Sequence, residues 1–113
     1  MSDEEVINYS QKTIALEANR NWLGFLKYYL ALQTDVAGNR EEAIRVLREA
    51  LGDFDPLASN FRDVELEYAN CLLVLARELY YEGETYSEEL LELSLRVVPF
   101  FSLIEKSKRD PED

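Results

Sequence analysis

Histidine is absent from the 113-residue sequence, and cysteine, proline and glycine are scarce. The chain has one cysteine, Cys71, with three prolines and four glycines. The lack of histidine removes the commonest general base and the commonest metal ligand. A lone cysteine forms no intrachain disulfide, which fits a reducing, intracellular compartment. Since no histidine could activate it, we expect Cys71 in the core and not as a nucleophile.

Long apolar runs are absent as well. Charged residues interrupt every apolar stretch before it is long enough to cross a membrane. The first ten residues, MSDEEVINYS, are acidic and lack the apolar segment of a signal peptide. The carboxylate runs at 3–5, 63–67 and 82–92 lack calcium-loop spacing, and no phosphate-binding glycine motif occurs. We therefore expect solvated acidic faces, no membrane segment, no cofactor, no metal site and no enzyme activity.

Basic residues are few in comparison with acidic ones. The chain has 12 lysines and arginines against 23 aspartates and glutamates, a net charge of −11. Nucleic acids and anionic membranes repel such a chain, so neither is an expected partner. Residues 57–97 hold nine acidic and three basic side chains, a local charge of −6 that favours a basic partner segment. The alternative is that the charge only keeps the protein in solution.

The residues that are abundant favour helices. Hydrophobic residues make up 47 % of the chain, and Leu, Glu, Ala and Arg dominate it. Helical spacing of apolar residues predicts an all-α fold in a single domain, 1–107, with a frayed polar tail at 108–113. The five expected helices cover about 3–18, 21–37, 40–52, 60–82 and 86–106.

Local signals place the helix ends. Ser2 is expected to cap the first helix, and ANRN at 18–21 to separate it from the second, although one continuous helix is an alternative. The second and fourth helices are apolar almost all round, so both are expected to be central. Pro99 is expected to kink or end the last helix near Val98.

Two glycines predict sharp corners between helices. Gly38 can adopt the left-handed conformation that ends a helix, and Asn39 with Glu42 is typical of a capping box that starts the next. So short a corner makes the two helices antiparallel. Gly83, followed by Thr85 and Glu88, predicts a second corner of this kind.

These corners form part of an internal repeat. Ala31 and Ala76 stand seven residues before the two glycines, and Ala43, Leu47 and Ala50 follow Gly38 at small, large, small positions. The segments AGNREEAIRVLREAL and YYEGETYSEELLELSLRVVP each resemble the second half of a tetratricopeptide repeat, which implies antiparallel helical hairpins. The alternative is a generic five-helix bundle with two hairpins.

A narrower resemblance covers about residues 27–81. GNREEAIRVLREALGDFD followed by ELEYANCLLVLARELY resembles the first repeat and next long helix of the NASP-type histone chaperones. That resemblance implies a histone-binding, chaperone-like role.

The expected function is non-catalytic protein binding. Helical repeats bind partners along a groove lined by the first helix of each pair. The alternative is a structural or assembly subunit that buries apolar helix faces in a homo-oligomer or an obligate complex. In the register set by the glycines, the groove residues are Phe25, Tyr28, Leu32 and Asp35 from the second helix and Asn70, Leu73, Arg77 and Tyr80 from the fourth.

Overall fold

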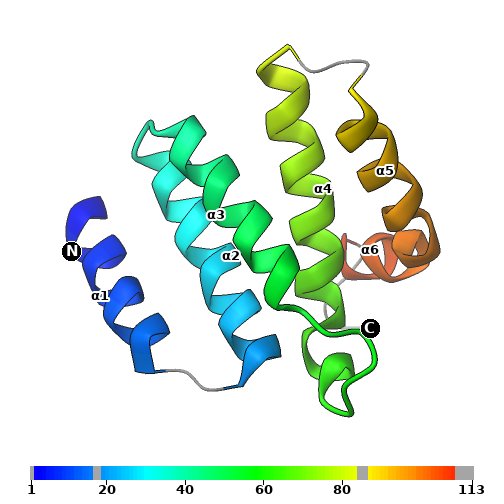
Figure 1. Cartoon of the computed structure of the whole chain (residues 1–113), viewed down its shortest axis with the longest axis horizontal. Coiled ribbons are helices and arrows are strands. Elements are labelled where there is room, and N and C mark those ends of the chain that lie inside the picture. The colour runs from blue at the N-terminus through cyan, green and yellow to red at the C-terminus, as the bar shows by residue number, and fades with distance from the viewer. Residues whose placement is uncertain (1, 17–18, 84–86, 109–113) are drawn as a thin grey trace.

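A computed structural model describes residues 2–16, 19–83 and 87–108, and within these ranges the chain is helical with no strand (Figure 1). The predicted all-α class is confirmed. The α-helices are α1 (Asp3–Leu16), α2 (Arg20–Val36), α3 (Arg40–Asp53), α4 (Glu65–Tyr81), α5 (Glu88–Val97) and α6 (Phe101–Lys108). Two short 3₁₀ helices, η1 (Phe61–Val64) and η2 (Val98–Phe100), lie before α4 and after α5.

The first two helices are separate. The Ser2 hydroxyl accepts the amide hydrogen of Glu5 at 3.2 Å, so the predicted cap of α1 is confirmed. Asn19 has extended backbone angles, and its side chain accepts from the amides of Asn21 and Trp22 at the start of α2. Because Asn19 caps a new helix, the predicted break is confirmed and a continuous helix is excluded.

Gly38 makes the predicted corner between α2 and α3. Its φ of +95° is left-handed, and a Schellman motif closes the helix end. The Gly38 amide donates to Asp35 O at 2.9 Å, and the Asn39 amide donates to Thr34 O at 3.1 Å. The chain then returns along α2, so that α3 lies beside it (Figure 1).

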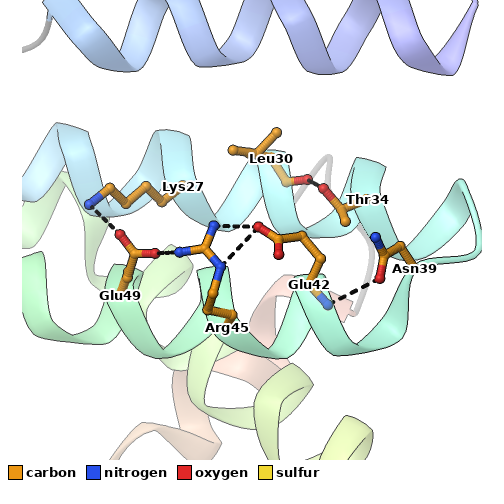
Figure 2. Close-up of polar contacts among 7 residues, drawn as sticks. All are labelled: Lys27, Leu30, Thr34, Asn39, Glu42, Arg45 and Glu49. Atoms are coloured by element: carbon orange, nitrogen blue, oxygen red, sulfur yellow. Dashed lines mark hydrogen bonds and ion pairs between the residues drawn. The ribbon is translucent and has the colours of Figure 1, made fainter.

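Only half of the predicted capping box forms at this corner. The Asn39 side chain accepts from the Glu42 amide at 3.2 Å, as expected (Figure 2). The expected return bond is absent, because the Asn39 amide is already committed to Thr34 and the Glu42 carboxylate pairs with Arg45. Hydrogen bonding from Arg45 holds the pKa of Glu42 below its usual value.

The fourth helix starts later than expected. The predicted helix over 60–82 begins with the 3₁₀ turn η1, and α4 proper starts at Glu65. The segment before it is held by Asn21, whose buried side chain accepts from the Asp55 amide at 2.7 Å and donates to Asn60 Oδ1 at 2.8 Å. These bonds anchor the longest irregular segment to the start of α2.

The second glycine also has a left-handed backbone, with φ of +89° at Gly83. The predicted cap, Thr85, lies outside the described residues. The helix starts at Glu88, and Ser87 caps it by accepting from the Leu90 amide at 3.1 Å. Pro99 ends this helix as predicted, since η2 follows at Val98 and the chain turns into α6 across the base of α4 (Figure 1). Lys108, predicted in the polar tail, ends α6, and 109–113 lie outside the described residues.

The core lies between α3, α4 and their neighbours, with α4 at its centre. The helices α2, α3, α5 and α6 all contact α4. Small residues Ala43 and Ala50 are completely buried on α3, and Ala31 is buried opposite them on α2. Small side chains at these positions leave room for neighbouring helices to pack closely, whereas Ala76, the matching small residue of α4, is only partly buried.

Candidate protein-binding site

The four predicted site residues of α2 are all partly exposed, and Phe25 and Tyr28 have different neighbours. Tyr28 lies against α4, where burial, aided by the nearby Cys71, raises the pKa of its phenol to about 12. Glu67 raises this pKa further, and Arg77 lowers it. Phe25 instead lines a hollow toward α1. Leu32 and Asp35 are partly exposed farther along α2.

The four predicted residues of α4 follow one another along that helix. Asn70 and Leu73 are half-buried, whereas Arg77 and Tyr80 are exposed. The Tyr80 ring meets the Tyr81 ring edge-to-face, with 6.1 Å between the centroids. The structure therefore brings Tyr28 and Arg77 together on neighbouring helices, whereas Phe25 belongs to a different hollow. We call the Tyr28–Arg77 region, with Leu73, the α2–α4 surface.

A buried carboxylate supports one side of this surface. Glu78 of α4 is only 2 % exposed, and its Oε1 accepts from Arg77 Nη2 at 3.2 Å. Its Oε2 forms an ion pair with Arg40 Nε at 3.1 Å, in a geometry that falls short of a hydrogen bond. Arg40 also stacks over the Tyr81 ring at 5.4 Å. Glu78 thus ties Arg77 to the start of α3. Sequence reasoning missed it, because a buried glutamate in a helix carries no local signal.

A second hollow, of about 500 Å³, lies between α3 and α5. Arg48 of α3 donates to both carboxylate oxygens of Glu89 across it, at 2.9 and 2.7 Å. Arg96 donates to the Tyr68 hydroxyl at 2.7 Å and lies over its ring at 5.8 Å. These bonds hold α5 against the core. Nothing in the sequence marks Arg48 and Glu89 as a pair, because 41 positions separate them.

Apolar side chains also follow the outer face of the C-terminal helices. Leu91 and Leu95 of α5 are 62 % and 65 % exposed, and their spacing of four residues places them on one side of that helix. Val98 of η2 and Phe101 at the start of α6 are 51 % and 52 % exposed. We call these four residues the C-terminal stripe. Leu93, which lies between the two leucines in sequence, is buried instead.

The chemical inventory of the described residues is simple. Cys71 is fully buried as expected, and burial raises the pKa of its thiol to about 12. The thiol is therefore protonated at neutral pH and has no nucleophilic form available. Within the ranges that the structure covers, no three Cys, Asp or Glu side chains gather as a metal site, and no helix is long and apolar enough to cross a membrane.

Comparison with protein-family models, with curated proteins and with solved structures finds no match for this chain. The function of the chain is therefore inferred from the α2–α4 surface and the C-terminal stripe.

Proposed function

We propose that the chain is a non-catalytic protein-interaction module that binds a basic segment of a partner protein along the α2–α4 surface. The observation that carries the proposal is the position of Tyr28, which is half-buried where α2 contacts α4 and where the charges of Arg77 and Glu67 act on its phenol. Half-buried apolar and aromatic groups beside charged groups are the composition of binding hot spots. Under this proposal α2–α3 and α4–α5 are tetratricopeptide-like pairs, and α2 and α4 are the first helices that face the partner.

Charge favours a basic partner. Ten ion pairs among the described residues engage seven of the chain's 12 basic side chains. Each of these seven cations is already beside a carboxylate. The excess of carboxylates gives the net charge of −11 and produces a negative electrostatic field outside the molecule. Such a field attracts lysine- and arginine-rich segments at low salt and is screened over about 10 Å at 0.1 M salt.

The narrower version of this proposal is histone escort inside the cell. It follows from the resemblance of residues 27–81 to the NASP-type chaperones, whose clients are basic. The closely packed Ala31, Ala43 and Ala50 agree with the helix crossing that the resemblance implies. A lone, buried Cys71 suits an intracellular protein.

Partner capture followed by mass spectrometry tests the proposal. Replacing Tyr28 and Tyr80 by alanine should reduce capture of a basic protein severalfold while leaving the helical circular dichroism nearly unchanged. Leu57→Ala is the control, because Leu57 is 94 % exposed in the segment before η1 and lies on neither α2 nor α4. Equal capture by both variants would show that the α2–α4 surface is not the binding site.

The C-terminal stripe supports a second candidate, an assembly subunit. Its four exposed apolar side chains are suited to burial against an apolar surface, either in a second copy or in an obligate partner. Sedimentation separates the two candidates. An apolar assembly should persist at high salt and grow with protein concentration, whereas docking of a basic segment should weaken as salt rises.

A further inference from the structure

A hollow of about 320 Å³ lies between α1 and α2, and half of its lining is aromatic. We call it the tyrosine cleft; its lining residues are Tyr9, Ser10, Thr13, Phe25, Leu26 and Tyr29. The lining contains no Asp, Glu, Lys or Arg side chain. The two tyrosines are 68 % and 51 % exposed, so they border the opening and solvent reaches both.

The aromatic rings of α2 are fixed against one another. Phe25 meets Trp22 edge-to-face at 5.6 Å between centroids, and it meets Tyr29 in the same way at 5.2 Å. On the other wall, the Thr13 hydroxyl donates to the Tyr9 carbonyl at 3.0 Å within α1. The Thr13 donor is therefore already used within its own helix. The cleft is apolar and aromatic, with rings supplied by two different helices.

We propose that the tyrosine cleft binds a quaternary ammonium group. The negative face of an aromatic ring attracts a cation, and quaternary ammonium groups are the cations that aromatic pockets bind best. The net charge of −11 raises the local concentration of cations and opposes anions. The volume of about 320 Å³ leaves room for a small head group with part of its stem.

The same features disfavour the other biological cations. A lysine ammonium is strongly hydrated, and it would lose that hydration in a cleft with no carboxylate to replace it. A guanidinium carries five N–H donors in a rigid plane that pairs best with a carboxylate, and this lining has none. A quaternary ammonium has no donor to satisfy, so its desolvation is the least costly of the three.

Two kinds of ligand present a quaternary ammonium group: a trimethylated lysine in a partner segment, and a free choline-type molecule. The first source rests on the proposed function, and the second is independent of it. The cleft lies on the α1 side of α2, whereas the α2–α4 surface lies on the α4 side. Substitutions at Tyr29 and at Tyr80 therefore separate the failure of one proposal from the failure of the other.

The decisive experiment compares choline with its neutral isostere 3,3-dimethylbutan-1-ol, using the full chain and following the tyrosine ring resonances by NMR. Choline should bind and shift the rings of Tyr9 and Tyr29, and the isostere should bind about tenfold more weakly, since it keeps the shape but lacks the charge. Tyr29→Ala should weaken choline binding about tenfold, and Tyr29→Phe should retain most of it. Tyr81→Ala is the matched control, because Tyr81 is 57 % exposed at the far end of α4.

A second arm titrates one basic peptide that carries either lysine or trimethyl-lysine at a single position. Preference for the trimethylated peptide, lost in Tyr29→Ala, supports the partner as the source; choline binding without peptide preference supports a free small molecule. Equal binding of choline and its isostere, equal loss in Tyr81→Ala, or no binding of either cationic probe would overturn the proposal.

Discussion

The Oε2 atom of Glu78, buried in α4, lies 3.1 Å from Nε of Arg40 at the first turn of α3. The two residues are 38 positions apart (78 minus 40), and their ion pair joins the two helical hairpins beside the Gly38 corner. Arg40 is 44 % exposed, whereas Glu78 is 2 % exposed. The pair is therefore asymmetric: water can hydrate the arginine alone, but it cannot hydrate the carboxylate.

This asymmetry predicts unequal effects of removing each partner. Arg40→Ala leaves a buried carboxylate that is paired with Arg77 alone, and it should lower the free energy of unfolding by roughly 2–3 kcal/mol. Glu78→Gln leaves Arg40 free to turn to solvent and should cost about 1 kcal/mol. Urea denaturation of the two variants measures both values. A larger loss for Glu78→Gln than for Arg40→Ala would contradict the account.

Gly24 and Gly52 offer a matched pair of helix glycines. A Cβ atom at Gly24 would lie 3.0 Å from three atoms of the buried Phe54 ring, whereas one at Gly52 would meet nothing within 4 Å. Gly24→Ala should destabilise the protein by about 1 kcal/mol or more, despite the better helix propensity of alanine. Gly52→Ala should be neutral or stabilise it by about 0.5 kcal/mol. Thermal melts followed by circular dichroism compare the two, and a gain in stability for Gly24→Ala would show that the Phe54 contact is not tight.

Asn21 should be the most sensitive asparagine of the chain. It is 1 % exposed and bonds both the Asp55 amide and the Asn60 side chain, so Asn21→Ala leaves buried polar groups without partners. We expect a loss of about 2–3 kcal/mol. Asn60→Ala, at a half-buried position that water can reach, should cost about 1 kcal/mol. Equal losses in urea denaturation would mean that Asn21 does not anchor the irregular segment.

Stability should fall at alkaline pH. The pKa of Tyr28 is raised from 10.0 to about 12, so folding favours its neutral form. The associated stability is fully present below pH 10 and is lost as pH rises through about 12; because solvent screens this half-exposed phenol, it amounts to about 1–2 kcal/mol. Cys71, raised from 9.0 to about 12, adds a loss of the same sign.

The Tyr28→Phe variant tests whether the alkaline loss of stability comes from the raised pKa of Tyr28. The variant should show a shallower decline of unfolding free energy between pH 10 and 12, and one late-titrating tyrosine should disappear from the near-ultraviolet phenolate titration. Loss of a tyrosine from the early part of the titration, near pH 10, would show that Tyr28 ionises like a solvent-exposed tyrosine.

Local sequence signals predicted most of the helix boundaries. The glycine corners at Gly38 and Gly83, the caps at Ser2 and Asn39 and the stop at Pro99 each depend on residues only a few positions away. Such signals act through backbone conformation and nearby hydrogen bonds, so they can be recognised without knowledge of the fold.

Contacts between residues far apart in the sequence could not be predicted in this way. The start of α5 is capped by Ser87, and both Thr85 and Ser87 are suitable cap residues two positions apart. The sequence also did not determine which helix packs against each side of α2, because α2 is apolar almost all round. Phe25, predicted among the groove residues, lines the tyrosine cleft. The pairings of Glu78 with Arg40 and of Asn21 with Asn60 are long-range contacts without a periodic pattern.

The most direct test of the binding account is an amide NMR titration of the isotopically labelled protein with a synthetic lysine–alanine repeat peptide at low and high salt. The account predicts shifts concentrated on α2 and α4 around Tyr28, Leu73 and Arg77, and the loss of these shifts at high salt. Shifts confined to the C-terminal stripe, or no shifts at low salt, would contradict it.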